Sequence, residues 1–125
     1  MNTIIRKFEI SNEQLSSLIV TALEGGVNYW CIECSVMYPR DPKTHKPVDM
    51  RPSDIVEKFD AWSLAFKEEE TDEYKYMDKN KFLNGISKAM DWGGFTDVED
   101  LLNNHDAETA DVIIQFAIFG EIVYG

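Results

Sequence analysis

Two cysteines separated by two residues, Cys31 and Cys34, are the side chains in this sequence whose spacing first suggests metal or redox chemistry. A structural zinc ion takes four ligands, which here would also require His45 and His105, and the spacing of these histidines fits no common zinc finger. Residues i and i+3 of a strand lie on opposite faces, so the two sulfur atoms should diverge. We therefore predict one buried and one half-buried structural cysteine, with no metal and no cofactor.

Two other groups of polar residues could take part in catalysis or ion binding. The pair His105-Asp106 could exchange protons, but no serine or cysteine in a nucleophile context accompanies it, so we interpret Asp106 as a helix cap and His105 as a surface residue. The acidic residues of 68–73 lack the alternating oxygen ligands and the glycine of a calcium loop, and they fit a solvated hairpin tip better. No catalytic constellation results, and we expect a protein that is not an enzyme.

The segment 24–30, with the sequence EGGVNYW, is the strongest candidate for a binding site. One interpretation is purely structural: a helix ends at a glycine in the left-handed conformation and turns into a strand, with the tyrosine and tryptophan packed. The other interpretation is a pocket for a ligand or partner, formed by free backbone groups near the two glycines, an asparagine amide and an aromatic wall. Both interpretations remain open from the sequence.

The candidate binding residues come from this segment and from the end of the chain, because the last residues could fold back beside the turn. They are Glu24, Gly25, Gly26, Asn28, Tyr29, Trp30, Glu121 and Tyr124.

The charge is strongly and unevenly acidic. There are 23 acidic and 12 basic residues, for a formal net charge of −11, and the segment 89–125 contains no lysine or arginine. Such a surface repels phosphate groups, so we expect no direct binding to nucleic acid. The basic residues of 40–51 alternate with all four prolines, which predicts an extended loop.

The first third of the chain predicts a strand, a helix and a second strand. Residues 3–10 are rich in β-branched and aromatic side chains, and Ser11 with Gln14 forms a capping box for a helix that ends at the two glycines. Residues 29–38 predict a strand. The alternation places the following side chains on its core face: Trp30, Ile32, Cys34 and Val36.

The middle of the chain predicts a short helix capped by Ser53 and then a hairpin. Apolar residues alternate over 62–68, an acidic turn follows, and the run 74–77 returns as the partner strand. A helical alternative also exists, because the apolar residues of 55–66 fit a helical spacing. We prefer the hairpin, because both aromatic runs alternate and a polar turn separates them.

Three helices are predicted in the last third. Asp78 caps the first, Thr96 with Glu99 caps the second, and Asp106 caps the third. In the third, over 107–119, the polar groups form a single narrow stripe, so protein should surround most of its circumference. The sum is a single α+β domain over residues 1–125, with a small antiparallel sheet packed against several helices.

Neither a secretory signal nor an apolar run long enough to span a membrane is present. Two cysteines are too few for a disulfide framework. We therefore expect a cytoplasmic protein without a membrane partner.

Two segments of the chain carry a family resemblance. Residues 21–30, TALEGGVNYW, and residues 116–125, FAIFGEIVYG, resemble segments of uncharacterised small acidic proteins of tailed bacteriophages and prophages, in which EGG-x-NYW and a terminal FGE-[IV]-V-[YF]-G recur. Residues 62–90 are also similar in order. The resemblance implies a phage accessory protein expressed in a bacterial host cell, and it implies no particular reaction.

Two functions fit these observations. The first is a non-catalytic binding protein that engages a host or phage protein, or sequesters a small ligand, through the glycine-aromatic segment. The alternative is an acidic mimic of nucleic acid that inhibits a host nucleic-acid enzyme as an anti-defence protein. A homo-oligomer is compatible with either function.

Overall fold

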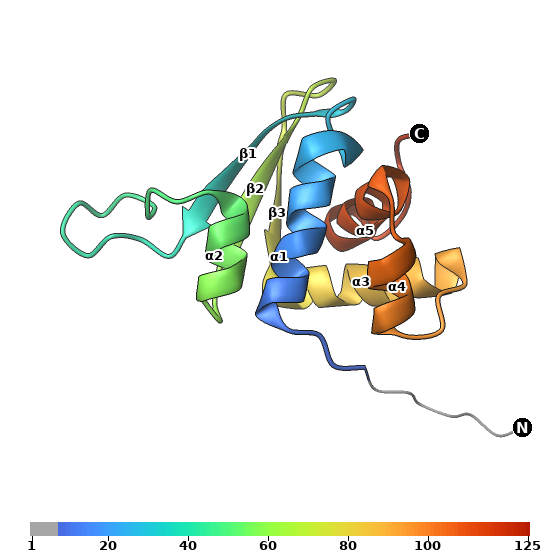
Figure 1. Ribbon diagram of the computed structural model, residues 1–125. Helices are drawn as coiled ribbons and strands as arrows, with labels where there is room; N and C mark the ends of the chain where they lie inside the picture. Colours follow the sequence, from blue (N-terminus) through green and yellow to red (C-terminus); the bar gives the residue numbers. More distant parts are fainter. Residues whose placement is uncertain (1–7) are drawn as a thin grey trace, which may run out of the picture.

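The computed structural model describes residues 8–125, which form a three-stranded antiparallel sheet and a group of helices that lie to one side of it (Figure 1). The predicted α+β class is therefore confirmed. The elements in chain order are α1 (Asn12–Thr21), the π-helical turn η1 (Ala22–Gly26), β1 (Cys31–Tyr38), α2 (Pro52–Lys58), β2 (Ser63–Glu68), β3 (Tyr74–Asp78), α3 (Lys79–Gly93), α4 (Val98–Asn104) and α5 (Ala107–Phe119).

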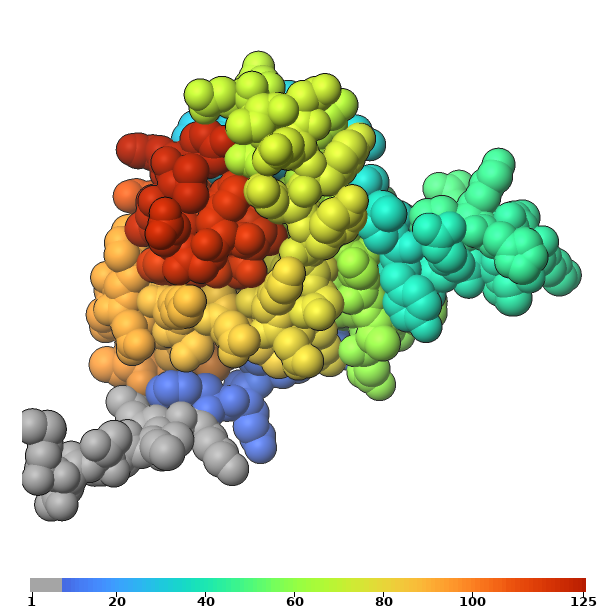
Figure 2. All heavy atoms as spheres, turned by 180° about the vertical axis from the view of Figure 1, so that it is seen from behind, coloured from blue at the N-terminus to red at the C-terminus, as the bar shows by residue number. Residues whose placement is uncertain are grey.

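The strand predicted over residues 3–10 falls mostly outside the described residues. Its last part, residues 8–10, has no strand structure. The loop of 39–51, which the prolines predict, projects from the body of the molecule (teal in Figure 2). No helix within residues 8–125 combines the length and the apolar character that crossing a membrane requires.

The predicted hairpin is confirmed, and the helical alternative is wrong. β2 pairs antiparallel with β3, with Leu64 opposite Met77 and Phe66 opposite Lys75. Leu64 and Phe66 are fully buried and Trp62, just before the strand, is 3% exposed. The hairpin forms because the alternation over 62–66 places apolar side chains on the face of the sheet that meets the helices.

The predicted core face of β1 is wrong at its start. Cys31 pairs with Glu68 but Glu33 pairs with Lys67, so Ile32 is an extra residue opposite the partner strand. Such a bulge shifts the alternation. Ile32 is consequently 55% exposed while Cys31 is buried.

Several helix boundaries follow the predicted caps. Ser11 and Gln14 form the capping box of α1, and the side chains of Asp78 and Asp106 cap α3 and α5. Gly120 ends α5 as predicted.

Two caps differ from the prediction. α4 is capped by Asp97, whose carboxylate accepts from the backbone N–H of Asp100, one position after the predicted Thr96. α2 begins at Pro52, whose ring fixes the backbone angle of a first helical turn, so the helix starts before the predicted cap Ser53.

The described residues share one hydrophobic core, in which α5 lies against α3 and η1. The helices α3 and α5 approach closely at Gly85, where an added Cβ would lie 2.6 Å from the carbonyl oxygen of Ile113. α5 also contacts η1, and this contact positions the candidate site.

Candidate functional site

The end of the chain folds back onto the turn between η1 and β1. The ring of Tyr124 stacks on the ring of Trp30, with centroids 5.3 Å apart and planes inclined by 5°. The Tyr124 hydroxyl donates to Glu68 Oε1 at 2.7 Å, which attaches the tail to the hairpin. Figure 2 shows the C-terminal segment in red beside the yellow-green hairpin. Two of the segments that the sequence singles out thus lie side by side.

Gln115, in α5, holds this tail in place. Its Oε1 accepts the backbone N–H groups of Val123 and Tyr124, both at 2.8 Å, and its Nε2 donates to the carbonyl oxygen of Tyr124 at 3.1 Å. The side chain is completely buried. The Gln115 amide therefore satisfies backbone N–H and C=O groups of the tail, as a neighbouring strand would in a sheet.

Asp111 lies one helical turn before Gln115 and is 5% exposed. Its Oδ1 accepts from Trp30 Nε1 at 2.7 Å and from Gln115 Nε2 at 2.9 Å, and its Oδ2 accepts from the Tyr29 hydroxyl at 2.5 Å. No salt bridge to Asp111 occurs within residues 8–125. Among the described residues, the donors to this buried carboxyl group are therefore all neutral.

The predicted polar stripe of α5 is thus not a solvent-facing side of the helix. Asp111 and Gln115 are buried by the turn and the tail, and only Glu108 of the stripe is exposed. The stripe is the side of α5 on which the candidate site is built.

Both tyrosines of this region keep their protons to high pH. Desolvation, followed by the hydrogen bond to Asp111, raises the pKa of Tyr29 to about 12. The hydrogen bond to Glu68, followed by desolvation, raises the pKa of Tyr124 to about 12. Each hydroxyl therefore acts as a hydrogen-bond donor to a carboxyl group.

Gly26 ends η1, but not in the predicted left-handed conformation. Of the described glycines, those with positive φ are Gly94, Gly120 and Gly125. An added Cβ at Gly26 would lie 2.9 Å from the carbonyl oxygen of Ala107 and 3.2 Å from the backbone nitrogen of Asp111. The glycine is needed because the backbone of α5 passes directly against it.

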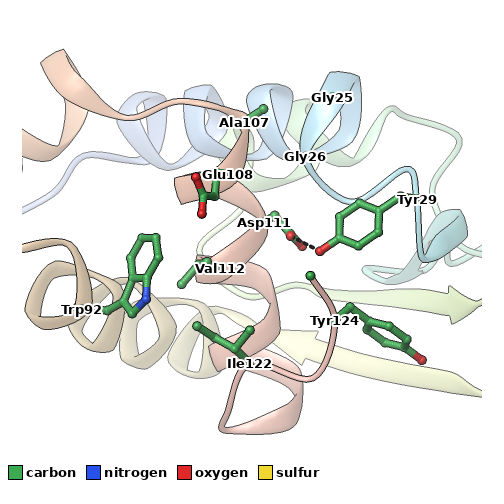
Figure 3. Close-up of a pocket in the computed structure, with 11 residues that line it drawn as sticks. Gly25, Gly26, Tyr29, Trp92, Ala107, Glu108, Asp111, Val112, Ile122 and Tyr124 are labelled. Atoms are coloured by element: carbon green, nitrogen blue, oxygen red, sulfur yellow. Dashed lines mark hydrogen bonds between the residues drawn. The ribbon is translucent and has the colours of Figure 1, made fainter.

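A pocket of about 480 Å³ opens between η1, the first turns of α5, the end of α3 and the tail (Figure 3). Four predicted binding residues line it: Gly25, Gly26, Tyr29 and Tyr124. In Figure 3 the Tyr29 ring lies on one side, with its hydroxyl directed at Asp111, and the Trp92 ring lies on the other.

The other four predicted residues lie outside the lining. Glu24 is exposed, and its carbonyl oxygen accepts from the Asn28 side chain at 3.3 Å. Trp30 is buried behind the pocket as the partner of Asp111, and Glu121 is exposed on the tail. The structure therefore does not bring these four residues together at the pocket.

Sequence reasoning missed the lining residues that come from other elements: Trp92, Ala107, Glu108, Asp111, Val112, Ile122 and Gly125. A signal for part of this set exists in the sequence, because the polar residues of α5 share one helix face at spacings of three and four.

The remaining chemical candidates lie in packed surroundings. Cys31 is buried and Cys34 is half-buried, and burial is the main cause that raises the pKa of both thiols. His105 is half-buried rather than on the surface, with Nε2 3.1 Å from Thr21 Oγ1 and Nδ1 2.9 Å from the carbonyl oxygen of Leu102. In the described part of the chain, no three His, Cys, Asp or Glu side chains are grouped to hold a metal ion.

Comparison of the chain with protein-family models, with curated proteins and with solved structures gave no match.

Proposed function

We propose that this chain is a non-catalytic phage accessory protein of the bacterial cytoplasm that binds a host or phage protein, or a small ligand, in the pocket between η1, α5 and the tail. One observation carries the proposal. The turn that holds Tyr29 and Trp30 meets α5, 82 positions later in the sequence, at Asp111, a buried acidic side chain that also lines a pocket. The resemblance of residues 21–30 and 116–125 to phage proteins supports the proposed phage origin of the chain and its proposed location in the bacterial cytoplasm.

The size and lining of the pocket suit a ligand or an inserted side chain. Binding pockets for small molecules commonly measure about 300 to 1,000 Å³, with mostly apolar walls and a few placed polar groups. The pocket here has about 480 Å³, with apolar walls that include Val112 and Ile122 and with carboxyl groups from Glu108 and Asp111.

The network around Asp111 supports binding because it prepares the pocket in advance. The Tyr29 side chain is fixed through its hydroxyl, and the tail is fixed through Gln115. A partner would therefore spend little of its binding free energy on ordering these groups.

The titratable side chains that line the pocket are those of Tyr29, Glu108, Asp111 and Tyr124. Among the described residues that line the pocket there is no serine, threonine, cysteine, histidine or lysine. Tyr29 stays protonated at neutral pH, with its pKa raised to about 12, so it cannot act as a base there.

Affinity capture from bacterial lysate, with and without nuclease, tests the proposal when wild type is compared with Trp92→Ala. Trp92 is 44% exposed, so its removal should leave the fold intact. Tyr74→Ala on β3, which removes a ring that is 43% exposed, is the matched control. Loss of a captured protein or ligand in Trp92→Ala alone is expected. Equal capture by all three proteins would refute binding at this pocket.

The acidic mimic remains the second candidate, and its supporting observation is the exposed acidic surface around α4. Asp91, Asp97, Glu99 and Glu108 are all exposed, and the segment 89–125 contributes no cation. A mimic would bind a basic groove and compete with DNA, whereas the pocket proposal requires no nucleic-acid enzyme as partner.

A further inference from the structure

We propose that the pocket binds an organic cation, namely an alkylammonium group on a short aliphatic chain. This inference rests on the proposed function, because it names the chemical class that the same pocket takes.

The charge of the lining selects against anions. Glu108 and Asp111 lie one turn apart on the same side of α5, and Figure 3 shows both carboxyl groups at the pocket. No lysine, arginine or histidine is among the described residues that line it, and no salt bridge within residues 8–125 involves either acid. An anionic ligand would be repelled, while an ammonium group would supply the missing positive charge.

The buried acid retains capacity for a further donor. Oδ1 of Asp111 accepts two hydrogen bonds, but Oδ2 accepts only the one from Tyr29. A carboxylate oxygen has two acceptor sites, and an ammonium group has three donors. A charge-assisted hydrogen bond to Oδ2 would complete the coordination of the carboxylate.

The aromatic walls favour the same class of ligand. Tyr29 and Trp92 lie on opposite sides of the pocket in Figure 3, with 53% and 44% of their surface exposed. Ring faces attract cations, most strongly at tryptophan. The cation–π contact that the described residues make, between Lys67 and Tyr74, lies on the hairpin, so neither pocket ring has a cation supplied by residues 8–125.

The apolar part of the lining accommodates the carbon chain. Val112 and Ile122 lie between the two rings in Figure 3 and offer contact to methylene groups. Burial of methylene groups against these side chains is favourable, because it removes apolar surface from water. The ligand therefore combines an ammonium head with a short hydrocarbon chain, as in a polyamine or a lysine side chain.

An NMR titration with three probes of equal chain length tests the charge requirement: butylammonium, n-butanol and butyrate. We expect the indole N–H signal of Trp92 to shift with butylammonium, and the dissociation constants of n-butanol and butyrate to be at least about tenfold weaker. Glu108→Gln and Trp92→Ala should each weaken butylammonium binding by about fivefold. For Trp92→Ala the reporter is the Tyr29 backbone amide.

Matched variants outside the pocket serve as controls. Glu99→Gln removes an exposed acid of α4 and Tyr74→Ala an exposed ring of β3, and both should bind butylammonium as wild type does. Spermidine and an Nα-acetyl-lysine amide distinguish the two sources of the cation. Tighter binding of spermidine indicates a free polyamine. Tighter binding of the lysine derivative indicates a lysine side chain of a protein.

The outcomes separate this inference from the function on which it rests. Equal affinity for n-butanol and butylammonium, or no effect of Glu108→Gln, would overturn the cation and leave the pocket as a binding site. The absence of an NMR shift with any of the three probes would also overturn the proposal of a cationic ligand. If capture from lysate in addition survives Trp92→Ala, the proposed function fails as well.

Discussion

The Tyr29 hydroxyl donates a hydrogen bond of 2.5 Å to Oδ2 of Asp111, joining two residues that lie 82 positions apart in the sequence. The same carboxyl group accepts from Trp30, the residue that follows Tyr29. A single aspartate therefore fixes the turn between η1 and β1 against α5. Tyr29, which lines the pocket, and Trp30, which packs in the core, are thus both held by Asp111.

Asp111→Ala should destabilise the protein by about 2 to 5 kcal/mol, because it leaves the buried indole N–H of Trp30 and the hydroxyl of Tyr29 without their acceptor. Asp111→Asn keeps an acceptor oxygen, and it should cost only about 1 kcal/mol. Urea unfolding of both variants measures the difference. An Asp111→Ala variant as stable as wild type would show that the network contributes nothing to folding.

Gly26→Ala and Gly25→Ala should differ, although the two residues are neighbours in the same turn. A Cβ at Gly26 would lie 2.9 Å from the Ala107 carbonyl oxygen, whereas at Gly25 the nearest atom is the Ala107 Cβ at 3.9 Å. Overpacking against backbone costs about 1 to 3 kcal/mol, so Gly26→Ala should be destabilising. Gly25→Ala should be neutral or slightly stabilising.

Thermal unfolding of the two variants measures the difference in stability. A loss of stability at Gly25 as large as that at Gly26 would contradict the close-approach account.

Part of this architecture is readable from the sequence, because its signals are local. The capping box at Ser11, the aspartate cap at position 106 and the alternation over 62–68 each act within a few residues, and the structure confirms them. The bulge that exposes Ile32 has no such signal, since it depends on the register with β2.

Only part of the candidate site can be predicted from the sequence, because the rest depends on tertiary contacts. Tyr29 and Tyr124 stand out as aromatic residues in unusual segments, and both line the pocket. Glu108 and Asp111 look like the polar side of an ordinary amphipathic helix. Their role follows from the tertiary contact between α5 and η1, which no pattern along the chain specifies.

Trp62→Ala should cost about 3 to 5 kcal/mol, because it removes a side chain that is 3% exposed and packs edge-on against Phe82. That is a large share of the stability of a small domain. Tyr76→Ala, which removes a ring that is 50% exposed on β3, is the control and should change the melting temperature little. A Trp62→Ala variant that melts within a few degrees of wild type would contradict this packing.

Stability should fall as pH rises from 10 to 12. Burial and the contact with Asp111 raise the pKa of Tyr29 from 10.0 to about 12 in the folded protein, so its contribution is complete below pH 10 and is lost as the pH approaches 12. Urea unfolding across this range measures the loss. Tyr29→Phe should reduce the pH dependence, and an unchanged profile would contradict the assignment.

Reversing the charges of Glu99 and Asp100, while leaving the pocket residue Glu108 unchanged, separates the two proposed functions. A nucleic-acid mimic should lose its partner, and the wild-type complex should weaken steeply with salt and compete with DNA. The pocket proposal predicts that reversal of Glu99 and Asp100 alone leaves capture intact. Titration of the complex with salt and with competitor DNA gives the answer.

Hydrogen exchange of the wild-type protein, free and with its captured partner or ligand, tests the central claim most directly because it locates the bound surface. We predict slower exchange at the backbone amides of η1, the first two turns of α5 and residues 121–125, with β3 unchanged. Protection confined to α4 or to the hairpin, with these segments unaffected, would contradict binding at the pocket.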